Sequence, residues 1–285
     1  MNTAVIGGIF TPFSFEFFRN GIAVATLAGT LCGILGVFVV LRGMSYIGHG
    51  LSHAVFGGAA ASAVMNINYF VGAGFWGVTS GVIIGRIARK RVIGADAAIG
   101  IVTTASFAMG LVLLNKFGQA QKSIEAVLFG SVLGVHTIDI VAVAVVTVCV
   151  IAVVIAMYRS FLFATFDPEV AQVSGVRVAL IEALLMAMLS LTILVTMRVI
   201  GTLLISALLV IPASVARMLT NSFAKMLWLS PIIGGFSAFV GMFLAFHFDT
   251  SASATIILVG TVLFIGVYSF SGIRGRSRIA GIHSH

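Results

Sequence analysis

The chain has 285 residues, of which 60% are hydrophobic and only 8% are charged, and its mean hydropathy is +1.19. A soluble domain of this length could not bury so many apolar side chains, so the composition excludes a soluble protein. Segments of about ten residues with alternating polarity, which mark an outer-membrane barrel, are absent from the sequence. We therefore predict an all-α polytopic membrane protein that forms a single transmembrane domain over residues 1–285.

The formal net charge of +8 would suggest a nucleic-acid partner in a soluble protein. Here basic loops held at the cytoplasmic surface explain the charge, and the sequence contains no nucleic-acid module. The N-terminus lacks a basic region ahead of a short apolar run and a cleavage site, so we expect no removable signal peptide. Cys32 and Cys149 lie in apolar segments and indicate neither a disulfide framework nor a thiolate metal site.

Nine apolar segments are long enough to be predicted as membrane spans, and eight spans with one re-entrant segment are the alternative. The segments are residues 17–41, 47–65, 67–85, 95–115, 137–157, 177–197, 199–216, 226–246 and 252–271. Small residues such as Gly29, Gly33, Gly81 and Gly85 recur within them. Such residues permit helices to pack closely in lipid, where apolar burial gives no drive for association.

With nine spans, the basic residues divide unequally between the two sides of the membrane. Twelve fall on one side and four on the other, which accounts for all sixteen. Because basic loops stay in the cytoplasm, we predict an external N-terminus and a cytoplasmic C-terminus. The twelve are Arg42, Arg86, Arg89, Lys90, Arg91, Arg159, Arg177, Arg217, Lys225, Arg274, Arg276 and Arg278, and the four are Arg19, Lys116, Lys122 and Arg198.

Two histidines, His49 and His53, lie in the second apolar segment, within the stretch Arg42–Ala63. Their spacing of four residues places both imidazoles on one helical face, about 6 Å apart at the backbone. Imidazoles at this spacing are a common transition-metal arrangement, and an ionisable group inside a membrane is by default a functional candidate. The alternative is a hydrogen-bonded packing pair near a helix end.

The stretch GMSYIGHGLSHAVFGG also resembles the signature of the metal-uptake permeases of ATP-binding-cassette importers, the zinc, manganese and iron family. The family's usual form is an aspartate, two residues, Ser-His-Ala and then often Leu-Pro-Gly. Ser52, His53 and Ala54 match this form. His49 stands where the aspartate is usual, and Gly57 stands where the proline is.

The longest predicted outer connection is residues 116–136, and its half IEAVLFGSVLGV is apolar but too short to span the membrane. We predict that this half dips into the membrane and returns. The triplet Leu128-Phe129-Gly130 resembles a stretch of the same family. Glu125 and His136 could attract an entering cation, and the alternative is a surface carboxylate with an interfacial histidine.

The predicted cytoplasmic loop 158–176 contains a helix with clear start and stop signals, at residues 167–175. Asp167 suits the N-cap, Pro168 the first turn and Glu169 the positive end of the helix dipole, and Gly175 suits the stop. The sequence FDPEVAQVSGV is similar to the family's coupling helix. That resemblance implies that Asp167, Glu169, Ala171 and Gly175 belong to an element that docks into an ATPase subunit; the alternative is an ordinary amphipathic loop helix.

Two later residues carry weaker predictions. Glu182 lies about one turn into its span from Arg177, so we expect it to form an ion pair or to extend towards the surface. Pro212 resembles the family's proline at the end of an apolar helix, near the cytoplasmic end of the span 199–216. A break there is tolerated where neighbouring groups satisfy the freed carbonyl.

His247 and Asp249 are the last candidate metal ligands, near the outer end of the eighth segment. In the family a histidine on a late helix joins the pair on the second helix, and the resemblance assigns that place to His247. At about 1.5 Å per residue, however, His53 lies ~16 Å above Arg42 and His247 lies ~33 Å above Lys225. Either Pro231, Gly234 and Gly235 shift the helix, or His247 belongs to an outer gate.

The resemblance implies the membrane subunit of an importer of divalent transition metals, in a prokaryotic inner membrane. It implies two copies of this chain, a separate ATP-binding cassette ATPase and an extracytoplasmic metal-binding protein. The sequence agrees, because it contains no G-x-x-x-x-G-K-[ST] motif and not even a Gly-Lys dipeptide. The chain is therefore not expected to be an enzyme or to hold a permanent cofactor, and its metal ion is the cargo.

Two other functions compete with this interpretation. A proton-coupled secondary transporter usually places several carboxylates at mid-membrane, where this chain offers only Glu182, near a span end. An intramembrane metalloprotease would need the glutamate of H-E-x-x-H, which His49-Gly-Leu-Ser-His53 lacks. Among metals, His49 exchanges an oxygen ligand for a nitrogen, which favours zinc, copper, nickel or iron(II) over manganese, with zinc slightly preferred.

Overall fold

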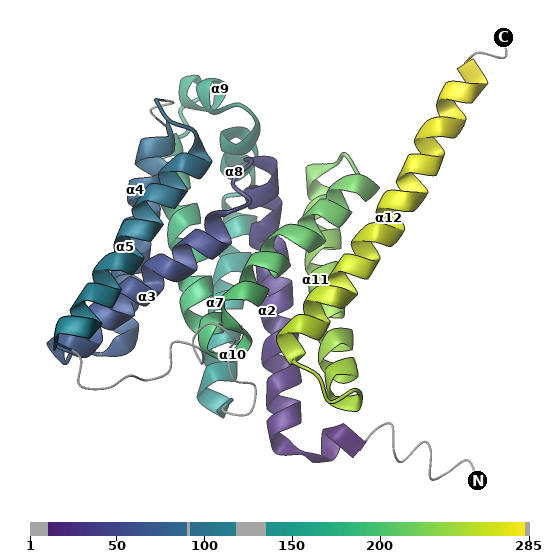
Figure 1. Cartoon of the computed structure of the whole chain (residues 1–285). Helices are drawn as coiled ribbons and strands as arrows, with labels where there is room; N and C mark the ends of the chain where they lie inside the picture. The colour runs from purple at the N-terminus through teal and green to yellow at the C-terminus, as the bar shows by residue number, and fades with distance from the viewer. Residues whose placement is uncertain (1–10, 90–91, 118–134, 283–285) are drawn as a thin grey trace, which may run out of the picture.

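A computed structural model of the chain describes residues 11–89, 92–117 and 135–282, and all regular secondary structure in these ranges is helical (Figure 1). The elements in chain order are η1 (Thr11–Ser14), α2 (Glu16–Leu41), α3 (Ile47–Met65), α4 (Tyr69–Arg89), α5 (Ala95–Phe117), α7 (Thr137–Ala156), α8 (Tyr158–Phe166), α9 (Pro168–Val173), α10 (Val178–Leu219), α11 (Phe223–His247) and α12 (Ala252–Ile282). The predicted all-α membrane bundle is confirmed.

Within the described residues, eight segments are long and apolar enough to cross a membrane. Eight of the nine expected spans correspond to them, while the segment 47–65 forms α3, whose glycines, serines and histidines lower its apolar content. Figure 1 shows α3 running obliquely from the end of α2 to the start of α4. The predicted re-entrant half of residues 116–136 lies outside the described residues.

Two of the eight spans belong to α10, which bends sharply at Gly201. Gly201 has φ 76° and ψ 162°, a conformation that a residue with a Cβ adopts only at a steric cost. The bend lies two residues into the second of the two spans, which are Val178–Met197 and Val199–Leu219. Pro212, in contrast, does not end its helix, since α10 continues through it to Leu219.

Glycines allow the central helices to touch backbone to backbone, as the small residues predicted. A Cβ at Gly29 of α2 would collide with the carbonyl of Gly234 in α11, and a Cβ at Gly234 would collide with Gly29. In the same interface the Ser230 hydroxyl donates to the Gly33 carbonyl oxygen at 2.7 Å. On the other side of the bundle, Gly57 of α3 lies against Ser106 and Gly110 of α5.

The two ends of the bundle differ in which elements they hold. Figure 1 shows α8, α9 and the C-terminal end of α12 at one end, and η1 with the start of α12 at the other. Aromatic contacts close this second end, where Phe13 and Phe18 pack against Phe243 and Phe246 of α11. Which end faces the cytoplasm stays a prediction from the charge distribution.

Candidate metal and coupling sites

The two histidines of α3 converge on one point. Their Nε2 atoms lie 3.2 Å apart, and the ring planes are perpendicular with centroids 4.6 Å apart. His49 is exposed and His53 is half-buried. The predicted shared helical face is therefore confirmed, and it brings two ring nitrogens within the reach of one proton or one ion.

This separation suits a metal ion. In a tetrahedral site with metal–nitrogen bonds of about 2.0–2.1 Å, two imidazole nitrogens lie about 3.3 Å apart. The alternative predicted from the sequence, a hydrogen-bonded pair, fits the same distance when one ring donates and the other accepts. The hydrogen-bonded pair keeps a proton on one Nε2, whereas a bridging metal ion needs both Nε2 atoms unprotonated. Metal binding would therefore displace that proton.

Neighbouring helices hold the pair in place. The His53 ring packs edge-on against Phe107 of α5 at 4.8 Å, and Phe107 packs against Phe56 at 5.2 Å. Gly48 and Gly50 leave no room for a Cβ, because Leu209 of α10 and Ile99 of α5 occupy that space. The glycines around the histidines thus let two helices contact α3 beside the pair.

His247 and Asp249 lie at the far end of α11, in the turn that leads to α12. His247 is exposed, and its Nδ1 lies 2.9 Å from the Phe243 carbonyl oxygen. Donation to that carbonyl would leave Nε2 available as a ligand. Asp249 is exposed and has φ 49°.

The described residues contain no group of three or more His, Cys, Asp or Glu side chains able to hold a metal ion. Accordingly, the structure brings His49 and His53 together but does not gather His247 or Asp249 into a larger set with them. The role of these two residues, in the metal site or in an outer gate, stays a prediction.

The predicted helix of the loop 158–176 is present as α9, and its ends use the predicted residues. The Asp167 carboxylate accepts from the Val170 amide at 3.0 Å, and Pro168 occupies the first turn. At the other end, Gly175 has φ 82°, and the Val176 amide donates to the Ala171 carbonyl oxygen at 2.9 Å. This is the hydrogen-bond pattern of a glycine stop.

α9 is anchored on one side and exposed on the other. Ala171 is fully buried, whereas Val170 is 51% exposed and Val173 is 91% exposed. Glu169 lies in the first turn, also exposed. The helix therefore presents two apolar side chains outward while Ala171 holds it against the bundle.

Glu182 forms an ion pair, but its partner is distant in sequence. Its Oε2 atom lies 3.0 Å from Nε of Arg89, the last residue of α4. Arg177, which lies nearer in sequence, is the exposed N-cap residue of α10. The ion pair joins the end of α4 to the first turns of α10.

Of the two residues expected to attract a cation at the outer connection, only His136 is described. It is the N-cap residue of α7 in a capping box with Asp139, whose Oδ2 accepts from the His136 amide at 3.0 Å. This is a local structural role. Glu125 and Leu128–Gly130 lie outside the described residues.

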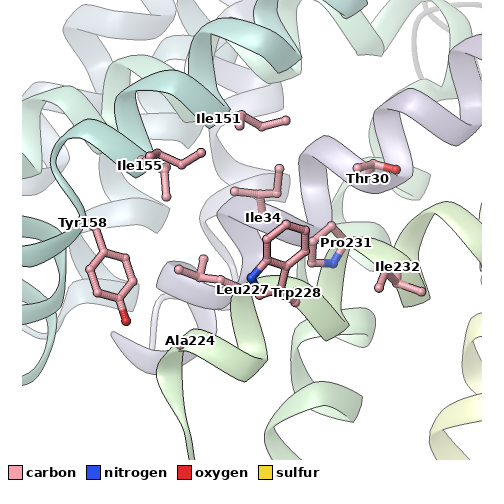
Figure 2. Close-up of a pocket in the computed structure, with 11 residues that line it drawn as sticks. Thr30, Ile34, Ile151, Ile155, Tyr158, Ala224, Leu227, Trp228, Pro231 and Ile232 are labelled. Atoms are coloured by element: carbon pink, nitrogen blue, oxygen red, sulfur yellow. The ribbon is translucent and has the colours of Figure 1, made fainter.

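An apolar cavity of about 410 Å³ lies between α2, α7 and α11 (Figure 2). Its lining is almost entirely apolar, with Ile34, Ile155 and Trp228 among the contributors, and only Thr30 and Tyr158 add hydroxyl groups. It has none of the nitrogen or carboxylate ligands that a transition metal needs. This cavity is therefore not part of the candidate metal site.

The sequence did not predict the contact between two residues near α9, Arg42 and Thr165. Arg42 caps the end of α2, and its Nε lies 3.4 Å from the Thr165 hydroxyl of α8. From the sequence, Arg42 is only one of the basic loop residues. The spacing along the chain carries no signal for a contact between residues so far apart.

Comparison with known proteins gives consistent results. The model of the ABC 3 transport family matches residues 14–271. The manganese transport system membrane protein MntC of Listeria monocytogenes is 34% identical over 92% of this chain and 93% of its own. A probable iron transport system membrane protein of Haemophilus influenzae is 35% identical, over 93% and 97%.

Two solved structures are similar to the fold. One is PsaBC from Streptococcus pneumoniae in complex with Fab, with a TM-score of 0.81, 30% identity and coverage of 92% of this chain and 95% of the other. The second is an inward-facing conformation of a putative metal-chelate type ABC transporter. It has a TM-score of 0.68 and 17% identity, covers 88% and 84% of the two chains, and supports the fold alone.

Proposed function

The chain belongs to the ABC 3 transport family, and on that premise we propose that His49 and His53 form its metal-transfer site and α9 its ATPase-coupling element. As a member, it is the membrane-spanning permease subunit of an importer in a prokaryotic cell membrane. ATP hydrolysis belongs to a separate subunit. The cargo, the partners and the residues that serve them are our proposals.

The observation that carries the metal site is the convergence of two Nε2 atoms at 3.2 Å on α3. Two nitrogen ligands bind a transition metal weakly enough for release, because further ligands must come from water or from another part of the assembly. A transport pathway needs this property, since an ion held by a complete ligand shell would not move on.

We favour iron(II) as the cargo. Nitrogen ligands suit iron(II), zinc and copper better than manganese, and the relatives compared above are named as manganese and iron systems. Iron(II) is the metal that is both favoured by nitrogen ligands and named for one of these relatives. Manganese is the second candidate because of the relatives, and zinc, slightly preferred from the sequence, has only the ligand chemistry in its support.

The coupling role rests on the shape of α9. Its two ends are capped, Ala171 anchors it to the bundle, and Val170 and Val173 are left exposed. On the cytoplasmic side such apolar side chains need a partner surface. We propose that an ATPase subunit supplies that surface, that a second copy of this chain completes the transporter, and that an extracytoplasmic binding protein delivers the ion.

The test is reconstitution of the permease in liposomes with its cognate ATP-binding cassette subunit and binding protein. Uptake of radioactive iron(II), manganese and zinc would be measured with ATP, without ATP and without the ATPase. We expect uptake only with ATP and the ATPase, and fastest for iron(II). Equal uptake without the ATPase would instead support a secondary transporter, and a clear preference for manganese or zinc would replace iron(II) as the cargo.

A further inference from the structure

A cavity of about 370 Å³ with a partly polar lining lies beneath α9, where the ends of α2 and α4 meet the start of α10. Pro168 and Gln172 of α9 line one wall, and Arg42, Arg89 and Glu182 contribute three charged groups. Two guanidinium groups thus face one carboxylate. Arg89 is paired with this carboxylate, which leaves Arg42 as the guanidinium without a paired anion among the described residues.

Arg42 is held incompletely. Its Nε reaches the Thr165 hydroxyl at 3.4 Å, near the limit of a hydrogen bond, and its Nη2 is buried without a partner within the described part of the chain. Burial lowers the pKa of the Arg42 guanidinium, and the nearby Glu182 carboxylate acts in the opposite direction. A buried cationic donor without an acceptor is unfavourable, so this side chain gains free energy by moving to a better partner.

The Glu182 carboxylate is the better partner that the cavity offers. An ionised carboxylate has about four acceptor positions, so Glu182 can accept from Arg42 while it keeps Arg89. Its Oε2 makes a 3.0 Å ion pair but has no well-directed hydrogen bond. Space for the movement exists, because both side chains line the same cavity.

Arg42 also links α9 to the histidines, because its hydrogen bond with Thr165 joins two segments that are far apart in the chain. Thr165 precedes the N-cap residue Asp167 by two positions, and Arg42 precedes His49 by seven. Between Arg42 and His49 there is only the tight turn that leads into α3. A displacement of α9 that pulls on Thr165 would therefore reach the start of α3 through one side chain.

We propose that Arg42 is a positioning residue that couples α9 to α3 by exchanging Thr165 for Glu182 as its partner during the transport cycle. The inference rests on the proposed function, since it requires that α9 be moved by the ATPase. In the state of this structure Arg42 contacts the α8–α9 segment. In the alternate state it joins the Arg89–Glu182 pair, and the start of α3 follows.

The experiment measures the number of ATP molecules hydrolysed per metal ion transported, in liposomes that contain the permease, its ATPase and its binding protein. Arg42→Gln and Glu182→Gln should each raise this number by about tenfold, the size of a typical coupling energy. The double variant should be no worse than Glu182→Gln alone, because that variant already removes the Arg42–Glu182 contact together with the Arg89 ion pair. Arg42→Lys keeps the charge, so it should raise the number of ATP molecules per metal ion less than Arg42→Gln does.

A matched control and an opposite perturbation sharpen the test. Arg86→Gln removes an exposed arginine from the same turn region of α4 and should leave the ratio unchanged. Thr165→Val removes the partner that Arg42 has in this structure. The rate of ATP hydrolysis in the absence of metal should therefore change in the opposite direction to its change in Glu182→Gln. A purely structural role would lower the amount of assembled complex in both variants and would not move the two activities apart.

The outcomes separate this inference from the proposed function. Wild-type protein without ATP-dependent uptake would contradict the proposed function itself. Normal wild-type uptake with an unchanged ratio in Arg42→Gln and Glu182→Gln would overturn only the role of Arg42. Independent, multiplying effects in the double variant would overturn the partner exchange. If Arg42→Gln fails to assemble, a wild-type ratio in the single variant Glu182→Gln would also overturn it.

Discussion

The Nε2 atoms of His49 and His53 lie 3.2 Å apart on consecutive turns of α3. Two unprotonated nitrogens would repel each other at this distance, so the arrangement requires a shared proton or a shared cation. Phe107 packs against the His53 ring and limits its rotation. The pair is thus already close to the geometry in which it would hold a metal ion.

The first prediction concerns His53→Ala. If His53 is a transient ligand, the variant should lose metal-dependent growth and take up metal at least about tenfold more slowly. Even replacing a residue that only hydrogen-bonds to a metal ligand lowers metal affinity or activity by about 10–100-fold. Uptake of radioactive metal is measured at matched levels of inserted protein. His247→Ala, at the far end of α11, tests separately whether that second candidate ligand also contributes to uptake. Unchanged uptake in His53→Ala would remove the pair from the pathway.

The second prediction concerns His49→Asp, which restores the aspartate usual at this position. Transport should persist, and the preference should move towards manganese, because a carboxylate oxygen suits manganese better than an imidazole does. Competition between manganese and iron(II) in the same uptake assay measures the change. His49→Asn offers a neutral control of similar size, and it should not produce the same shift.

Local signals predicted the elements well, while contacts between distant residues escaped prediction. The start and stop of α9 depend on Asp167 and Gly175, whose preferences act within a few residues, so the sequence was sufficient. The partner of Glu182 depends on which helices meet. The sequence led us to expect an ion pair or extension towards the surface without naming the partner, and packing of α4 against α10 supplies Arg89.

The same distinction holds for the candidate metal site. A period of four residues placed His49 and His53 on one face, because helix geometry alone determines it. Whether His247 joins them depends on how α11 packs and on which molecules assemble around the pair. The spacing of residues along one chain predicts neither the packing of α11 nor the molecules that assemble around the pair. The bend at Gly201 could not be predicted either, because nothing in the sequence distinguishes this glycine from the other glycines in apolar segments.

The third prediction concerns α9 as the coupling element. A proline at Ala171 would remove the hydrogen bond from its amide to the Asp167 carbonyl oxygen, which is 2.9 Å long, and would break the helix. Glu169→Lys would place a positive charge at the positive end of the helix dipole. Both should uncouple ATP hydrolysis from uptake or release the ATPase during purification. An intact complex with normal coupled turnover in both variants would contradict the coupling role.

The fourth prediction concerns the contact between α2 and α11. Gly234→Ala would force a methyl group against the backbone of Gly29, and overpacking of this kind costs roughly 1–3 kcal/mol. The thermal unfolding temperature in detergent should fall. Gly100→Ala in α5 is the matched control, because nothing lies within 4 Å of a Cβ there. That variant should be neutral or slightly stabilising, as an alanine in a helix usually is.

The last prediction concerns orientation, on which the coupling role depends. With α3 counted as a crossing beside the eight candidate spans, twelve basic residues against four predict that α9 and the loop after α4 face the cytoplasm, and that the turn after α11 faces outward. Single cysteines at Arg86, Gln172 and Ser251, all exposed, would report these positions in a variant that lacks Cys32 and Cys149. Arg86 is preferable to Arg89, whose replacement would break the ion pair with Glu182.

A membrane-impermeant thiol reagent would be added to intact cells, or to spheroplasts where an outer membrane intervenes. It should label the cysteine at Ser251 and spare those at Arg86 and Gln172, which should react only after the membrane is opened. Labelling after opening controls for cysteines that are inaccessible for local reasons. Labelling of Gln172 from outside would mean that no cytoplasmic ATPase could reach α9, and the coupling roles of α9 and of Arg42 would both be wrong.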